Sequence, residues 1–255
     1  LAEGALNSNT HLQRQSGDSS LSRQFSTNDR MLRYKRINSL FYTDTFFATK
    51  SARSRPRGNN CMQIFVSDKG FVAVYPMKSK SDFKDCLHMF CKEIGVPNTL
   101  VMDKAGEQTS NAVKHFSQQV GLSLRVLEEH TQWANRAELY IGLWKESIRK
   151  DLHTSNCPLV LWDYGAERRA LIHNLTPRDL FQTSGMTPVE ATFGTQGDIS
   201  NLCIFGWYEW CYYREEGKHM FPYQKTLLGK VLGPSKNEGN EMANNILTHN
   251  GQVVP

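Results

Sequence analysis

The first part of the chain contains apolar runs whose spacing predicts strands. Three short runs are rich in aromatic and β-branched residues, a composition that favours strands, and they are residues 40–47, 62–66 and 71–77. A basic loop at residues 49–60 separates the first two runs, and Asp68-Lys69-Gly70 between the other two is typical of a hairpin turn. We therefore predict three antiparallel strands, with Asp44 inside the first.

From residue 81 onward the apolar positions recur mainly every three or four residues, which predicts helices. Phe83, Leu87 and Phe90 begin the first apolar stripe, and Gly95 ends it. Further helices are predicted at 110–119, 133–152 and 159–174, with strands at 99–102 and 122–127 between them. This order indicates one mixed α/β domain over residues 36–176.

The two ends of the chain have a different pattern. Residues 1–35 are rich in Ser, Asn, Gln and Arg, so we expect a disordered or poorly packed lead-in. Residues 177–255 are predicted to be loops and strands that form a C-terminal extension with a small β module, ending in a hairpin with an Asn-Gly turn at 246–254. Because the first residue is Leu, we expect a piece of a longer polypeptide, or a sequence that lacks its natural start.

Aromatic residues concentrate in this extension between residues 203 and 213. They are Trp207, Tyr208, Trp210, Tyr212 and Tyr213. Two interpretations stay open, which are stacking on nucleic-acid bases and a small core built from alternating aromatic side chains. The alternation favours the core.

The composition fits a folded intracellular protein. Of the 255 residues, 39% are apolar and 22% are charged, as in globular domains, and no run of about eighteen apolar residues predicts a membrane span. The six cysteines include no Cys-x-x-Cys pair, and no His pair lies at zinc-finger spacing. We therefore expect reduced, buried thiols and no zinc in this segment.

Basic charge is concentrated around the first strand. From Arg33 to Arg57 the sequence holds seven basic residues and a single acid, Asp44, in a chain whose net charge is +5. Such a patch favours a polyanionic partner, and a solvated run of charge is the alternative. The predicted phosphate-contacting residues are Lys50, Arg53, Arg55 and Arg57 in this patch, and Lys145 and Arg149 downstream.

Three acids occupy positions that suggest a metal site. Asp44 lies inside an apolar strand, where Asp is disfavoured, Asp103 stands at the carboxyl end of another strand, and Glu138 lies near the start of an amphipathic helix. Converging carboxylates bind hard cations such as Mg²⁺, and two such ions serve the attacking and leaving oxygens of phosphoryl transfer. The alternative is that these acids are ordinary turn formers, helix caps or surface residues.

The helix that carries Glu138 favours the metal site. One face of it is an apolar stripe, whose members are Ala137, Ile141, Trp144, Ile148 and Leu152. Glu138, Lys145 and Arg149 fall in a narrow sector beside that stripe. This arrangement suits a metal ligand at the edge of a cleft, with phosphate contacts leading away from it.

Three stretches of the chain resemble the integrases of copia-type retrotransposon polyproteins. The first is Tyr42-Thr43-Asp44-Thr45 with the later Tyr75-Pro76-Met77-Lys78-Ser79-Lys80. The second is Asp103-Lys104-Ala105-Gly106-Glu107-Gln108-Thr109-Ser110, followed by Thr131-Gln132-Trp133-Ala134-Asn135-Arg136-Ala137-Glu138. The third is Thr187-Pro188-Val189-Glu190, then Asp198-Ile199-Ser200-Asn201-Leu202 and Phe205-Gly206.

The resemblance implies an RNase H-like fold, which is a mixed sheet with three antiparallel strands first and helices on both faces. It also implies a catalytic triad of Asp44, Asp103 and Glu138 that holds two Mg²⁺ or Mn²⁺ ions. The implied activity is 3′-end processing and strand transfer of element DNA. The implied partners are DNA and further copies of the chain, acting in the nucleus.

Two other functions stay open. The family's Asn-Gly after its second Asp is replaced here by Lys104-Ala105, and a lysine beside a metal ligand favours a decayed module that binds DNA without catalysis. An RNase H-like nuclease that only hydrolyses has the same fold. Strand-transfer products distinguish the integrase from the nuclease, and metal-dependent activity of any kind distinguishes both from the decayed module.

Overall fold

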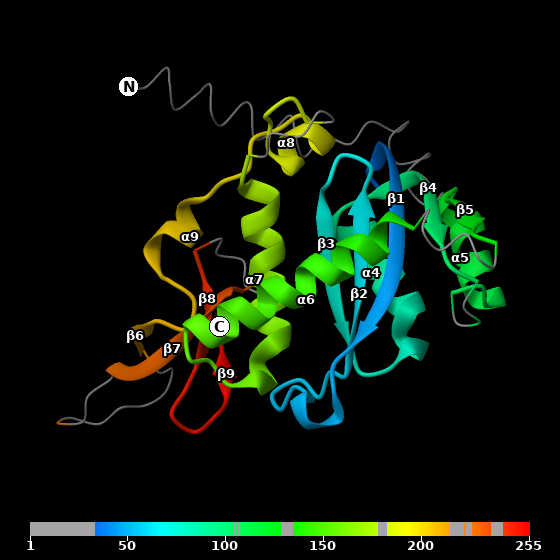
Figure 1. Ribbon diagram of the computed structural model, residues 1–255. Helices are drawn as coiled ribbons and strands as arrows, with labels where there is room; N and C mark the ends of the chain where they lie inside the picture. Colours follow the sequence, from blue (N-terminus) through cyan, green and yellow to red (C-terminus); the bar gives the residue numbers. More distant parts are fainter. Residues whose placement is uncertain are drawn as a thin grey trace, which may run out of the picture.

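A computed structural model gives the arrangement of the chain (Figure 1). It describes residues 34–104, 106, 108–128, 135–177, 183–214, 222, 226–235 and 242–255. The lead-in predicted for residues 1–35 lies almost entirely outside the described residues. So do Ala105, Glu107 and residues 131–134 of the stretches that resemble copia-type integrases.

Five strands form a central mixed sheet in the order β3-β2-β1-β4-β5. They are β1 (Arg36–Phe47), β2 (Cys61–Ser67), β3 (Val72–Met77), β4 (Val96–Met102) and β5 (Ser123–Val126). The first three pair antiparallel, as predicted, whereas β4 runs parallel to β1 and β5 runs parallel to β4. This order and mixture of directions is the RNase H-like arrangement that the sequence predicts.

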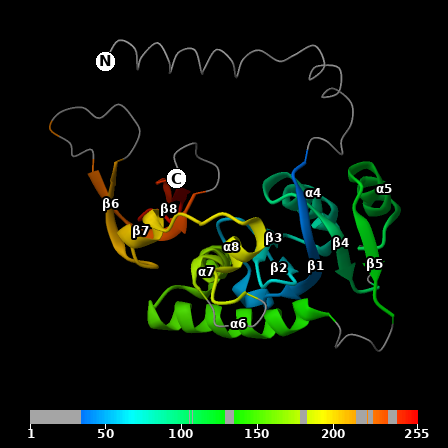
Figure 2. The same cartoon turned by 90° about the horizontal axis from the view of Figure 1, so that it is seen from above.

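Helices cover both faces of this sheet. The helices α4 (Phe83–Glu93) and α5 (Asn111–Val120) pack on one face, and α6 (Arg136–Thr154) and α7 (Trp162–Leu175) pack on the other (Figure 2). Successive side chains of a strand point to opposite faces, so Phe41 of β1 joins the core under α4, whereas Phe46 joins the core under α6. Every member of the apolar stripe predicted on α6 is buried.

Short 3-10 helices extend three of the connections between these elements. They are η1 (Lys50–Ala52) in the basic loop, η2 (Lys80–Asp82) before α4, and η4 (Leu159–Leu161) before α7. The predicted helices therefore begin later than expected, at Phe83 and Trp162. The Ser79 side chain caps η2 and the Asp82 side chain accepts from the Ser79 backbone N–H, which is a capping box.

A second, four-stranded sheet follows the helices α8 (Pro188–Phe193) and α9 (Ser200–Ile204). Its strands are β6 (Trp210–Arg214), β7 (Thr226–Pro234), β8 (Asn244–Leu247) and β9 (Val253–Val254). All of its pairings are antiparallel, so the predicted small β module is present. The expectation that only loops and strands follow residue 177 is wrong at α8 and α9.

Local interactions explain the start of α8 and the form of the last hairpin. The Thr187 hydroxyl accepts from the Glu190 N–H at 3.1 Å and Pro188 takes the first helical position, which together start α8. The hairpin of β8 and β9 is confirmed, but a five-residue loop closes it instead of a two-residue Asn-Gly turn. In that loop the Thr248 N–H donates to the Gln252 carbonyl at 2.8 Å, and Gly251 has a φ of +76°.

Two expectations drawn from the composition concern the cysteines and membrane-spanning helices. All six cysteines are free, and five are buried. Cys203 is exposed on α9, which corrects the expectation that every thiol is buried. None of the described helices has both the length and the apolar character that a membrane span requires.

Candidate active site

The strands β1 and β4 bring Asp44 and Asp103 to neighbouring positions. Thr43 is opposite Met102 in their parallel register, so the residues that follow, Asp44 and Asp103, lie beside each other across strands roughly 4.8 Å apart. Asp44 and Phe46 share a face of β1, and Phe46 packs in the core under α6. The Asp44 side chain therefore lies on the α6 face of the sheet.

The first turn of α6 supplies the third acid. Glu138 is the acidic residue of that turn and is exposed. The helix begins after Asn135, whose side-chain oxygen accepts from the Ala137 N–H at 3.1 Å. This bond caps the helix and fixes where its first turn, with Glu138, starts.

The three carboxylates act on one another electrostatically. Burial is the main reason that the pKa of Asp44 is raised to about 6, against a 2.7 Å hydrogen bond from the Thr45 N–H that lowers it. The negative charges of Asp103 and Glu138 raise this pKa further. The structure therefore brings the three predicted acids into one neighbourhood.

These carboxylates do not form a closed coordination sphere. Within the described part of the chain, no group of three or more His, Cys, Asp or Glu side chains is arranged to hold a metal ion. The donor set still fits Mg²⁺ or Mn²⁺, because carboxylate oxygens are the ligands that these hard ions prefer. A cation would also offset the repulsion from Asp103 and Glu138 that raises the pKa of Asp44.

Asn135 connects the elements that carry the three acids. Its side-chain nitrogen donates to Asp103 Oδ1 at 3.1 Å and to the Thr43 carbonyl at 3.5 Å, while its side-chain oxygen caps α6. Asn135 is 3% exposed. The sequence contains no local signal for this role, since Asp103 and Thr43 are 32 and 92 residues away.

Lys80 is a further charged residue at this site that the sequence analysis did not single out. Its positive charge lowers the pKa of Asp44, and its Nζ lies 5.2 Å from the centroid of the Phe47 ring. It is exposed at the start of η2. The only sequence signal was its place in the Lys78-Ser79-Lys80 stretch of the family resemblance.

Two of the predicted cations lie on α6 beside the end of β1. Lys145 and Arg149 line a hollow of about 250 Å³ between α6 and the end of β1. The Lys145 Nζ is 5.7 Å from the Phe46 ring centroid, and Phe46 follows Asp44 by two positions on the same strand. The exposed Lys50 belongs to η1, whose Ala52 also lines the hollow.

The three arginines of the basic loop have different surroundings. Arg53 and Arg55 are exposed, and the Arg53 Nε donates to the Gly58 carbonyl at 3.1 Å. Arg57 is held by α7, because its Nη1 lies 2.5 Å from Glu167 Oε2 and its guanidinium stacks 3.8 Å from the Tyr164 ring centroid. Arg57 therefore anchors the loop. Phosphate contact by any of the six predicted cations stays a prediction.

Comparison with known proteins gives similarity at the level of three-dimensional structure. No protein-family model and no curated protein sequence matches the chain. A structure of the HTLV-2 integrase catalytic core domain with magnesium, in trimeric form, is 18% identical and covers 63% of this chain and 99% of its own, with a TM-score of 0.47. The dimeric form is 17% identical and covers 61% and 97%, with a TM-score of 0.45. The assignment of the fold rests on the strand order and directions described above.

Proposed function

We propose that this chain is the catalytic core of a copia-type retrotransposon integrase, which processes and joins DNA ends with divalent metal ions. The observation that carries the proposal is the meeting of Asp44, Asp103 and Glu138, from three different elements, on one face of an RNase H-like sheet. The three stretches of sequence resemblance support the finer assignment. The proposal includes further copies of the chain as partners and action in the nucleus.

Each side chain has a distinct role in this proposal. Asp44, Asp103 and Glu138 hold two Mg²⁺ or Mn²⁺ ions, which when bound stabilise the negative charge that develops in phosphoryl transfer. Asn135 orients Asp103 and fixes the start of the helix that carries Glu138. The cations Lys80, Lys145 and Arg149 bind phosphates on either side of the reacting one and so position the DNA strand.

A strand-joining assay tests this function. A labelled DNA duplex is incubated with supercoiled plasmid, Mn²⁺ and the chain, and we expect labelled products longer than the duplex. Asp44→Asn and Glu138→Gln are expected to abolish them, because each removes a carboxylate ligand. Asp85→Asn is the matched control, since Asp85 is an exposed acid on α4, and it is expected to join DNA like the wild type.

The other outcomes identify the two alternatives. Metal-dependent cleavage without joining would contradict the integrase and indicate a nuclease. DNA binding without metal-dependent activity would indicate the decayed module, which the exposed Lys104 directly after Asp103 favours.

A further inference from the structure

The hairpin of β6 and β7 carries exposed aromatic side chains that the proposed catalysis does not use. Trp210 is 59% and Tyr212 is 77% exposed, whereas Cys211 and Tyr213 are 5% and 8% exposed. The strand therefore turns Tyr213 inward and the other two rings outward. The aromatic core predicted from the sequence includes Tyr213 but not Trp210 or Tyr212.

A lysine lies between two rings on the outer face of this hairpin. Trp210 is opposite Lys230 in the register of β6 and β7, so both side chains lie on the same face. The Lys230 Nζ is 4.0 Å from the Trp210 ring centroid and 4.8 Å from that of Tyr208, which are cation–π distances. We call Tyr208, Trp210, Tyr212 and Lys230 the aromatic surface.

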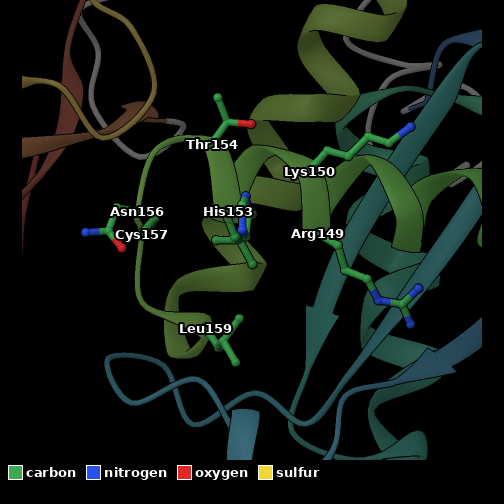
Figure 3. Close-up of a pocket in the computed structure, with 8 residues that line it drawn as sticks. Arg149, Lys150, His153, Thr154, Asn156, Cys157 and Leu159 are labelled. Carbon is green, nitrogen blue, oxygen red and sulfur yellow. The ribbon is translucent and has the colours of Figure 1, made fainter.

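A hollow with basic residues in its wall adjoins the aromatic surface. Its volume is about 800 Å³, and Arg149 and His153 of α6 and Cys157 after the helix are among the residues that line it (Figure 3). Burial raises the pKa of Cys157 to about 12, and the charge of Lys230 lowers it. Lys230 and Tyr208 therefore lie near Cys157 in the wall of the hollow.

We propose that the aromatic surface binds unpaired nucleotides, with bases stacked on Trp210 and Tyr212 and a phosphate near Lys230. Side chains two positions apart on a strand are roughly 6.8 Å apart, which is about twice the 3.4 Å rise per nucleotide of a duplex strand. Two adjacent bases therefore reach both rings only when they are not stacked on each other. Rings combined with cations are how proteins bind single strands without sequence preference.

This binding goes beyond the proposed catalysis and needs no metal ion. It is tested by fluorescence anisotropy of a labelled oligothymidine of about twelve nucleotides, in EDTA, with the full chain. Trp210→Ala and Tyr212→Ala are expected to weaken binding roughly 5- to 100-fold each. Trp210→Phe and Tyr212→Phe keep a ring and are expected to retain most of the affinity.

Leu228→Ala is the control that separates base stacking from a protein contact. Leu228 is opposite Tyr212 on the same face and is 44% exposed. An apolar protein segment would need Leu228, whereas stacked bases need the rings, so we expect this variant to bind like the wild type. An equal loss in Leu228→Ala and Trp210→Ala would overturn the proposal.

Three further results bear on the proposal. The absence of oligothymidine binding by the wild type would overturn it. A duplex of the same length that binds as tightly as oligothymidine, and that Trp210→Ala weakens equally, would also overturn it. The exposed control Asp85→Asn is expected to bind oligothymidine like the wild type. Because this binding is measured in EDTA, failure of the metal-dependent catalytic proposal leaves the result intact.

Discussion

Asp44 destabilises the fold when it is ionised, because it is largely buried and lies near two other carboxylates. Its folded pKa is raised to about 6 from the ordinary value of 3.8. A raised pKa in the folded state means that the cost of ionisation is absent below about pH 4, grows between pH 4 and 6, and is complete above pH 6. Metal-free stability is therefore expected to fall as the pH rises through this window.

Asp44→Asn removes this cost. In metal-free buffer at pH 8 we expect the variant to unfold with a free energy about 1–3 kcal/mol higher than that of the wild type. Urea denaturation at pH 8 and at pH 4 measures the difference, which should disappear at pH 4. Equal stability of the two proteins at pH 8 would contradict a buried, charge-repelled Asp44.

Asn135 is expected to act through the residues that it positions. Asn135→Ala removes a helix cap and a donor to Asp103, so we expect a loss of about 1–2 kcal/mol in the free energy of unfolding. Asn135→Asp keeps the capping oxygen but loses the donor to Asp103 and places a buried carboxylate against it, so in metal-free buffer we expect thermal unfolding at least as early as in Asn135→Ala, together with loss of strand joining. An Asn135→Asp variant that joins DNA normally would exclude the positioning role.

Sequence patterns predicted the three acids but not the hydrogen bonds that connect the elements carrying them. Asp44 was identifiable because a charged residue interrupts an apolar strand, and Glu138 because it flanks an apolar stripe. The role of Asn135 depends on bonds to Asp103 and to Thr43 that only the folded chain makes. Lys80 likewise acts on the charge of Asp44 only in the folded chain.

At the scale of elements, the basic loop is fixed to α7 by a stacked ion pair. Arg57→Gln is expected to lower the free energy of unfolding by about 1 kcal/mol, because the pair with Glu167 is only partly exposed and the ring of Tyr164 loses its partner. Arg53→Gln removes an exposed charge that makes no ion pair within the described part of the chain, and it serves as the matched control in urea denaturation. Equal destabilisation by both variants would contradict the anchoring role.

The same two variants are expected to differ in DNA binding. Arg53→Gln should reduce the slope of log affinity against log salt concentration by about 0.9, if Arg53 neutralises one phosphate. Arg57→Gln should change this slope less, since Glu167 compensates the charge of Arg57. Binding measured across several salt concentrations checks both slopes, and a larger change for Arg57→Gln would contradict the expectation.

Elements with long apolar patterns were predictable, and short ones were not. The strands β1 to β5 and the helices α4 to α7 were all expected from the sequence. By contrast, α8 and α9 have six and five residues, too few for an apolar stripe to repeat. The strand β4 begins at Val96, earlier than expected, because Val96 and Pro97 pair with Arg36 and Ile37 of β1. The sequence pattern placed Pro97 in a loop, since proline is uncommon inside strands.

At the scale of the whole molecule, the two sheets share a core. Leu232 of β7 is 2% exposed and packs in the cluster that contains α6 and α7, and Trp207 lies 3.4 Å from where a side chain on Gly165 of α7 would begin. Leu232→Ala is therefore expected to destabilise the entire chain by about 2–4 kcal/mol in a single transition. Circular dichroism and tryptophan fluorescence during urea denaturation should report the same midpoint.

Leu228→Ala is the control for this prediction, because Leu228 lies on the same strand but is exposed. We expect its midpoint to match that of the wild type. Two separate transitions, with only one of them shifted in Leu232→Ala, would show that the second sheet unfolds independently. The boundary near residue 177 that the sequence predicts would then mark an independent domain.

Calorimetric titration of Mn²⁺ into the chain in the presence of DNA tests the central claim most directly. Asp44, Asp103 and Glu138 are claimed to form one site, so we expect the wild type and Asp85→Asn to bind about two ions per chain. Asp44→Asn is expected to lose this binding. The absence of Mn²⁺ binding by the wild type, or unchanged binding by Asp44→Asn, would contradict a carboxylate metal site at the meeting point of β1, β4 and α6.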